Sequence, residues 1–236
     1  MIENKIKVGL LGLGRTGRIV AESLFTDVNF DLLFAVKKNP PKIHDYAYSV
    51  ETKNDLQVLI KRFKPKILID FTTPEATLEN VKHLKKNMGI VIATTGFKEG
   101  EINQLKRYKN IKILYAPNIS DGINIFLKAC KVIDKLWPEA DVEIIEHHFK
   151  NKIDAPSGTA KKIANLFNKK VPIHSVRAGG IVGIHEVLFV RPNQKITLKH
   201  ESFNREVFAV GAKKAVSWLI KQKNGFYNME NLYNGT

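Results

Sequence analysis

A glycine-rich segment near the start of the chain places the tightest limit on the fold. It reads Gly12-Leu13-Gly14-Arg15-Thr16-Gly17, a G-x-G-x-x-G pattern. An apolar run, residues 5–11, precedes it, and a helix-permissive segment, residues 15–25, follows it. Glycines between a strand and a helix allow a tight turn and let a pyrophosphate approach the amides of the helix N-terminus. In this setting the motif predicts a βαβ unit that binds a dinucleotide.

The rest of the first half alternates strand-like and helix-like segments. Apolar runs typical of buried strands lie at residues 31–36, 67–71, 90–93 and 111–115. Residues 74–86 and 99–108 have the pattern of amphipathic helices, and Pro74 after two threonines is a helix-start signal. This alternation predicts a Rossmann-type parallel sheet with helices on both faces, in an α/β fold.

The second half is organised differently. Predicted helices cover residues 123–136, 158–168 and 205–221, and predicted strands cover residues 141–146, 174–178, 184–190 and 195–201. Turn residues, and no helices, separate the last three strands. This pattern predicts an α+β region with an open mixed or antiparallel sheet.

Composition limits the class of protein. The 236 residues suffice for one large domain or two modest ones, and 44% apolar with 26% charged residues is typical of a soluble globular protein. The apolar runs are too short to span a bilayer, and the N-terminus lacks the apolar region of a secretory signal. The single cysteine, Cys130, excludes an intrachain disulfide framework. We therefore expect a cytoplasmic protein with no membrane partner.

The charge balance is strongly basic, because 38 Lys and Arg face 23 Asp and Glu, which gives 38 − 23 = +15. Such a field favours anionic partners. The lysines are scattered along the chain, without a basic arm or a cluster interleaved with aromatic residues. The sequence therefore predicts a small anionic substrate and cofactor, no nucleic acid and no metal site.

The end of the second predicted strand bears on the choice of cofactor. In NAD-binding domains this strand usually ends in Asp or Glu, which accepts a hydrogen bond from the ribose 2′-OH. Here it ends in Lys37 and Lys38, where the 2′-phosphate of NADPH would lie. We therefore expect NADPH to be favoured over NADH, with an ordinary solvated loop as the alternative.

Two further loops follow predicted strands at their carboxyl ends, where open α/β sheets bind ligands. Residues 70–74 read D-F-T-T-P, and residues 93–97 read A-T-T-G-F. Their hydroxyls, amides and aromatic rings suit a nicotinamide ribose, although each loop alone could be a capping turn. The predicted cofactor contacts here are Phe71, Thr72, Thr94, Thr95 and Gly96.

A third segment, residues 146–160, concentrates titratable groups before a predicted helix. It reads E-H-H-F-K-N-K-I-D-A-P-S-G-T-A. Ser157 is a helix-capping residue, and free amides and hydroxyls at such a helix start would bind a carboxylate, with Lys152 adding positive charge. Strand alternation sends the side chains of His147 and His148 to opposite faces. A histidine beside this helix start can supply a proton near neutral pH.

This segment resembles the signature of the dihydrodipicolinate reductase family, which reads E-x-H-H-x-x-K-x-D-A-P-S-G-T-A. The resemblance extends over nearly the whole chain. It includes Asp70-Phe71-Thr72, Thr94-Thr95-Gly96-Phe97, Asn118-Ile119-Ser120, residues 175–183 and residues 225–229.

The resemblance implies an NAD(P)H-dependent enzyme of the diaminopimelate route to lysine. Such an enzyme transfers a hydride to a cyclic dicarboxylate, 4-hydroxy-tetrahydrodipicolinate, with loss of water. The resemblance also implies a dinucleotide-binding domain of residues 1–119, completed by residues 208–236. A substrate-binding domain, residues 120–207, would build a homotetramer through its sheet.

The resemblance also implies roles for particular residues. By position, His148 matches the proton-donating histidine and Lys152 matches the essential lysine. The groups that would hold one carboxylate are Ser157, Gly158 and Thr159, and Asn118 joins the cofactor contacts.

Two positions depart from the family pattern. Phe149 replaces the second histidine of the signature, and a local rearrangement that makes His147 and His148 the functional pair is the alternative. The glycine loop is one residue shorter than the usual G-x-x-G, and Thr16 replaces a common methionine. Asp154 precedes Ala-Pro, and we expect it to form a turn and not to act as an acid. We expect His185 and His200, which lie in predicted strands, to be structural.

Two other functions remain open from the sequence. One is another two-domain NAD(P)-dependent dehydrogenase, acting on an amino-acid semialdehyde. Its acyl-transfer version would need a nucleophilic cysteine, and Cys130 in the middle of a predicted helix argues against that. The other is a nucleotide-sensing regulator without catalysis, which the replacement at Phe149 keeps open.

Overall fold

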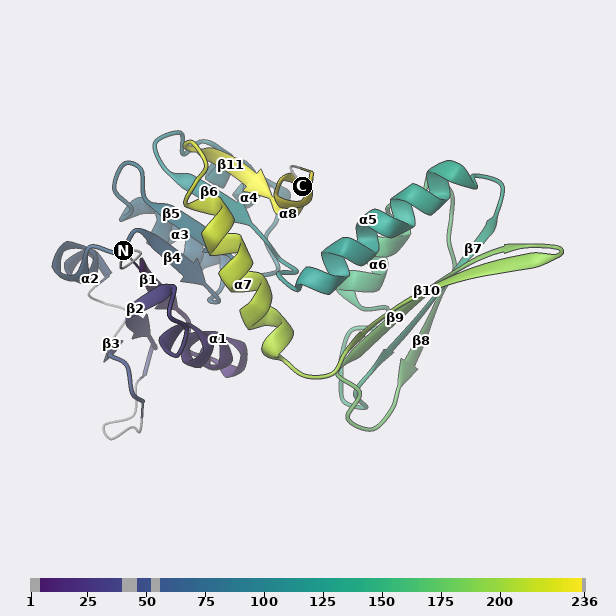
Figure 1. The fold of residues 1–236 in the computed structure, drawn as a ribbon, viewed down its shortest axis with the longest axis horizontal. Coiled ribbons are helices and arrows are strands. Elements are labelled where there is room, and N and C mark those ends of the chain that lie inside the picture. The colour runs from purple at the N-terminus through teal and green to yellow at the C-terminus, as the bar shows by residue number, and fades with distance from the viewer. Residues whose placement is uncertain (1–4, 40–45, 52–55, 235–236) are drawn as a thin grey trace. The chain divides into compact units, whose positions relative to one another are not determined.

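The computed structural model describes residues 5–39, 46–51 and 56–234. The chain divides into two compact units, Met1–Ser120 with Phe208–Thr236 and Asp121–Val207 (Figure 1). The C-terminal segment therefore returns to the first unit. None of the described helices combines the length and the apolar character that a bilayer-crossing helix needs.

The first unit contains a parallel sheet with the strand order β11-β6-β5-β4-β1-β2-β3. Its strands are β1 (Ile6–Leu11), β2 (Phe30–Val36), β3 (Val50–Glu51), β4 (Ile67–Asp70), β5 (Gly89–Ile92), β6 (Lys112–Tyr115) and β11 (Gly225–Asn228). Every neighbouring pair runs parallel. The central strands β4 and β5 are fully buried and, apart from Asp70 at the end of β4, apolar, as strands covered on both faces must be. The predicted Rossmann-type parallel sheet is thus confirmed.

Helices cover both faces of this sheet. On one face lie α1 (Arg15–Phe25), α7 (Glu206–Leu219) and α8 (Met229–Tyr233), whose apolar residues share one core with β1. On the other face lie α2 (Leu56–Phe63), α3 (Pro74–Lys82) and α4 (Glu99–Lys106), in a second core. Two separate apolar cores on opposite faces hold the carboxyl ends of the strands in a fixed row.

The second unit is a four-stranded mixed sheet in the order β10-β9-β7-β8. Its strands are β7 (Asp141–His148), β8 (Ile173–Arg177), β9 (Gly183–Arg191) and β10 (Gln194–Ser202). The β7–β8 pair is parallel, whereas β7–β9 and β9–β10 are antiparallel. This confirms the predicted open mixed sheet of an α+β region.

Two helices, α5 (Asp121–Leu136) and α6 (Gly158–Ala164), cover one face of the second sheet (Figure 1). The alternating burial of β7 and β9 directs every second side chain into that core. The other face carries apolar side chains that are only partly covered: Ile145, Val176, Ile184, Leu188 and Val190. No helix of the described second unit packs on these residues.

Some element boundaries differ from the sequence-based expectation. The α3 helix ends at Lys82, earlier than expected, with His83 as its C-cap; the chain then turns at Asn87, which has a φ of 68°, and enters β5. The α6 helix ends at Ala164, whereas β7 continues to His148. The short strand β11 and the helices α2 and α8 were not expected.

Candidate active site

The glycine turn after β1 leaves space beside the start of α1. Gly12 has a φ of +92°, and a Cβ there would lie 2.6 Å from the carbonyl oxygen of Phe71. A Cβ on Gly14 would meet no described atom within 4 Å. Gly14 is also the N-cap of α1 and has no side chain to engage the first amides of the helix. The turn can therefore present amides to a bound anion.

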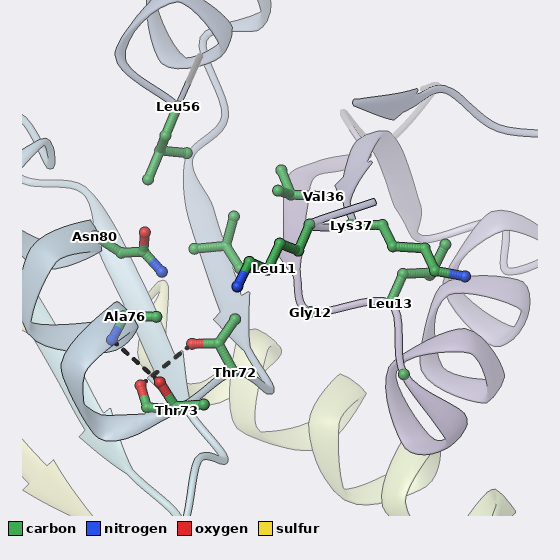
Figure 2. Close-up of a pocket in the computed structure, with 12 residues that line it drawn as sticks. Leu11, Gly12, Leu13, Val36, Lys37, Leu56, Thr72, Thr73, Ala76 and Asn80 are labelled. Carbon is green, nitrogen blue, oxygen red and sulfur yellow. Dashed lines mark hydrogen bonds between the residues drawn. The ribbon is translucent and has the colours of Figure 1, made fainter. Parts of the chain in front are cut away.

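A first hollow of about 430 Å³ lies beside this turn. Figure 2 shows it bounded by Gly12 and Leu13 on one side and by Thr72, Thr73 and Ala76 on the other. Lys37 and Lys38, predicted to meet a 2′-phosphate, both line it. A largely apolar lining that includes two lysines suits an adenosine that carries a phosphate.

A second hollow, of about 410 Å³, shares Gly12, Gly14 and Thr72 with the first. It brings together most of the other predicted cofactor residues: Arg15, Thr16, Gly17, Phe71, Thr94 and Thr95. Two predicted contacts, Gly96 and Asn118, line neither hollow. The Asn118 side-chain oxygen instead accepts a hydrogen bond from the Ser120 amide at 3.3 Å.

A buried carboxylate, Asp70, joins the two threonine loops, and sequence reasoning assigned it no role. Asp70 accepts hydrogen bonds from the Thr72 amide at 2.9 Å, the Thr94 hydroxyl at 3.1 Å and the Asn80 amide group at 3.0 Å. Burial raises the pKa of Asp70, and these hydrogen bonds oppose that rise. The network fixes the loops that end β4 and β5, beside both hollows.

In the second unit, Glu146 and His148 lie on the buried face of β7. Glu146 is fully buried and its Oε2 is in hydrogen-bond contact with Nδ1 of His148. Its Oε1 accepts from Nη2 of Arg177 at 2.6 Å and from the Ser157 amide at 3.3 Å. The carboxylate is thus held by a strand, a guanidinium and a helix start.

The charge of Glu146 follows from these partners. Burial opposes its ionisation, but hydrogen bonds from Arg177, Ser175 and His148 outweigh burial and lower the pKa of Glu146 to about 2. Burial lowers the pKa of His148, and the neighbouring carboxylate opposes this. Near neutral pH, Glu146 is therefore an anion that stabilises a proton on His148.

His185 belongs to the same cluster, although it was expected to be structural. Its Nε2 lies 3.4 Å from the Ser157 hydroxyl, and its ring meets that of His148 edge to face at 5.3 Å between centroids. Burial lowers the pKa of His185 to about 3, so it is neutral. The pairing of Glu146 with His185 across β7 and β9 brings it there, and a single sequence gives no signal of that register.

The donor groups at the start of α6 have hydrogen-bond partners within the chain. The Ser157 hydroxyl accepts from the Ala160 amide at 3.1 Å, and Asp154 accepts from the Gly158 amide at 3.3 Å. Nζ of Lys152 lies 2.5 Å from Asp154. Asp154 therefore holds both an amide and the ammonium group that were predicted to bind a substrate carboxylate, and Thr159 follows in the same turn.

The geometry of β7 bears on the alternative in which His147 and His148 act as a pair. His147 is half-buried and lies on the face of β7 opposite to His148, so the structure does not bring the two side chains together. Phe149 follows the end of β7 and is also half-buried. The group that stands beside Glu146 and His148 is Arg177, at the end of β8.

The cluster also has the donors of a metal site. One ligand atom each from Glu146, His148 and His185 lie within 4.8 Å of one another. However, the Arg177 guanidinium on Glu146 places a positive charge at the same point, which works against a second cation. Hydrogen bonding among these groups accounts for the arrangement.

Comparisons with known proteins agree with the motifs. Residues 122–233 match the family model for the C-terminus of dihydrodipicolinate reductase, and residues 6–119 match the model for its N-terminus. A 4-hydroxy-tetrahydrodipicolinate reductase from Buchnera aphidicola subsp. Cinara cedri is 35% identical over 98% of this chain and 98% of the relative. Another from Caldanaerobacter subterraneus subsp. tengcongensis is 36% identical over 93% of this chain and 94% of the relative.

A solved structure has the same fold. The dipicolinate-bound dihydrodipicolinate reductase from Paenisporosarcina sp. TG-14 has a TM-score of 0.85 and 29% identity, covering 97% of this chain and 99% of that one. Both halves of the chain, the full-length relatives and the fold agree. The chain therefore belongs to the dihydrodipicolinate reductase family.

Proposed function

We propose that this protein catalyses the NAD(P)H-dependent reduction of 4-hydroxy-tetrahydrodipicolinate to tetrahydrodipicolinate. The observation that carries the proposal is the buried array of Arg177, Glu146 and His148 beside Lys152 and the start of α6. This array can hold a proton next to groups that bind a carboxylate. The Paenisporosarcina relative binds dipicolinate, a cyclic dicarboxylate, which supports the same substrate class here.

His148 is proposed to supply the proton. Nδ1 faces the Glu146 carboxylate, which leaves Nε2 as the atom that exchanges a proton with the substrate. A Cβ on Gly183 would lie 3.3 Å from Nε2, so glycine at this position keeps that atom uncrowded. Arg177 and the Ser157 amide fix Glu146, and Glu146 in turn fixes the orientation of the imidazole.

Lys152 and the start of α6 are proposed to bind a substrate carboxylate. In this structure, Asp154 accepts from both Lys152 and the Gly158 amide. A substrate carboxylate would replace the Asp154 carboxylate on these donors, and the half-exposed Asp154 side chain is free to turn toward solvent. Ser157 and Thr159 complete this proposed contact.

The glycine turn and its two hollows fit a nicotinamide dinucleotide. The open space at Gly14 and the amides of α1 would hold the pyrophosphate, and Lys37 with Lys38 would hold a 2′-phosphate. The bound cofactor supplies the hydride. We propose NADPH as the favoured form, with Gly96 and Asn118 as outer members of the cofactor site.

Side-chain replacement tests these roles. His148→Gln or Lys152→Ala should lower kcat by roughly 10²–10⁴-fold, the range of general acid catalysis, and leave NADPH binding unchanged. Lys150→Ala is the matched control, because this lysine is exposed in the same loop. Retention of most activity in both site variants would contradict the assignment.

The cofactor preference has its own test. Lys37→Ala with Lys38→Ala should raise the KM for NADPH strongly and that for NADH little, since only NADPH carries the 2′-phosphate. Equal effects on both cofactors would show that these lysines do not discriminate between them.

We also propose that the partly covered face of the second sheet forms the interface of a homotetramer. The apolar residues Ile184, Leu188 and Val190 lie there in a row along β9, and the described second unit leaves them without a packed helix. Apolar faces of this kind usually belong to subunit interfaces.

A further inference from the structure

The amino ends of the parallel strands gather lysines that are scattered in the sequence. All neighbouring strands of the first sheet run parallel, so the loops that precede them lie along one edge. The exposed cations of this basic edge, in sheet order, are Lys221, Lys223, Arg107, Lys109, Lys85, Lys86, Lys64, Lys66, Lys5 and Lys7.

Backbone and side-chain hydrogen bonds hold these loops side by side. The Lys66 amide donates to the Lys7 carbonyl at 2.9 Å, and the Asn87 amide donates to the Asn110 carbonyl at 2.8 Å. The Asn224 side chain donates to that of Asn87 at 2.8 Å. Five strands spaced by about 4.8 Å give the basic edge a length of roughly 20 Å.

Four of the five loops that form the basic edge carry no negative charge, and the β1 end has Asp31 beside Lys7. The loops at residues 64–66, 83–88, 107–111 and 220–224 contain no Asp or Glu. In the described parts of the chain, no ion pair joins the lysines of these loops to a carboxylate. A hollow of about 240 Å³ at the centre of the row is lined by four of them, Lys64, Lys66, Lys85 and Lys86.

Contrary to the expectation from the sequence, in which these lysines are scattered, we propose that the basic edge binds the sugar-phosphate backbone of a nucleic acid. Successive phosphates of a strand are several ångströms apart, so an edge of roughly 20 Å faces several of them at once. A linear array of about ten cations matches a linear polyanion, whereas a small anion needs only one convergent cluster. The hollow between the loops at residues 64–66 and 83–88 seats the best-held phosphate.

Binding at this edge is independent of the cofactor. The glycine turn and both cofactor hollows lie at the carboxyl ends of the same strands, which is the opposite edge of the sheet. Contacts to phosphates alone make the binding independent of base sequence. It is also strongly salt-dependent: with about five contacts to a single strand, affinity falls about a hundredfold between roughly 50 and 200 mM salt.

Fluorescence anisotropy of a labelled single-stranded RNA, titrated with the full-length protein, tests the proposal. Lys66→Ala with Lys86→Ala should weaken binding and reduce the log–log salt slope by about 1.4, because each phosphate contact to a single strand contributes about 0.7. The control is Lys135→Ala with Lys170→Ala, which removes the same charge at exposed positions of the second unit. This control variant should bind the RNA with the affinity and salt slope of the wild type.

Saturating NADPH should leave the RNA bound, and NADPH binding to the Lys66→Ala, Lys86→Ala variant should be unchanged, which also reports its folding. Equal losses in the test and control variants would show that net charge alone is responsible, and would overturn the proposal. Displacement of the RNA by NADPH, or binding to anionic phosphatidylserine vesicles without binding to RNA, would overturn it as well.

Discussion

At the scale of the residue, a buried carboxylate controls the proton on a histidine. Glu146 is fully buried, held by Arg177, and in contact with His148. An ionised carboxylate stabilises the protonated imidazole beside it, while burial does the reverse. The balance between these two effects sets the pH range in which His148, the proposed donor, holds its proton.

This balance predicts a change in the pH profile. Glu146 raises the pKa of His148, so Glu146→Gln should lower that pKa further. The proton donor is active while protonated, and its activity is lost as pH rises through the pKa. The falling limb of kcat/KM should therefore move to lower pH in Glu146→Gln, and a pKa lower by about one pH unit means about a tenfold loss at neutral pH. His147→Gln, on the opposite face of β7, should leave the profile in place; an unmoved limb in Glu146→Gln contradicts the pairing.

His185 predicts a pH dependence of stability. Its pKa lies at about 3 in the folded chain and near the usual 6.5 when unfolded, so the unfolded chain binds the extra proton between these values. The free energy of unfolding should fall as pH drops below 6.5, by about 2 kcal/mol at about pH 5. Urea unfolding at both pH values should show that loss in the wild type and much less of it in His185→Gln. His174→Gln, an exposed control, should behave as the wild type does.

Some residues of this cluster could be predicted from the sequence, and others could not. The motif pointed to His148, Lys152 and Ser157 because they lie within one short signature, and the structure places His148 and Ser157 on the same carboxylate, Glu146. Alternation alone separates His147 from His148 and places Glu146 with His148. The roles of Arg177 and His185 depend on β8 and β9 pairing with β7 in one particular register, which no local pattern encodes.

At the scale of the element, the ends of β4 and β5 act as one structure. Asp70 ends β4 and accepts hydrogen bonds from Thr72, Thr94 and Asn80, which come from two loops and a helix. Most strands and most helices followed from hydrophobic periodicity, whereas the short strands β3 and β11 did not. The hydrogen-bond network around Asp70 could not be predicted from periodicity, because it depends on the parallel pairing of β4 with β5.

Loss of this network should weaken cofactor binding. In Asp70→Asn, a new amide donor would face the donors already present, leaving a buried group without a partner at a cost of about 1–3 kcal/mol. We expect a lower melting temperature and a raised Kd for NADPH, measured by thermal scanning and fluorescence titration. Asp141→Asn, at the exposed start of β7, is the control. An unchanged Kd would show that the loops hold their places without Asp70.

At the scale of the whole molecule, one chain builds two units with different sheets, and the C-terminal segment closes the first. The α/β alternation predicted the parallel sheet, and the missing helices predicted the mixed one. Strand β11 was missed because G-F-Y-N is too short to show a period, and only its pairing with β6 defines it.

The partly covered sheet face predicts the assembly state. Ile184→Glu with Leu188→Glu should lower the mass measured by light scattering from that of a tetramer, because two charges would be buried in the interface. Val210→Glu changes an exposed apolar residue in α7 and should leave the mass unchanged. A wild-type monomer, or an unaltered mass in the double variant, would contradict the proposed interface.

Turnover of the substrate tests the proposed reductase activity most directly. The purified protein, supplied with freshly generated 4-hydroxy-tetrahydrodipicolinate, should oxidise NADPH, and NADH less efficiently, as followed by the loss of nicotinamide absorbance. The oxidation should require the substrate and should be inhibited by dipicolinate. Binding of NADPH without substrate-dependent oxidation of either cofactor would contradict the account and identify the protein as a nucleotide-binding regulator.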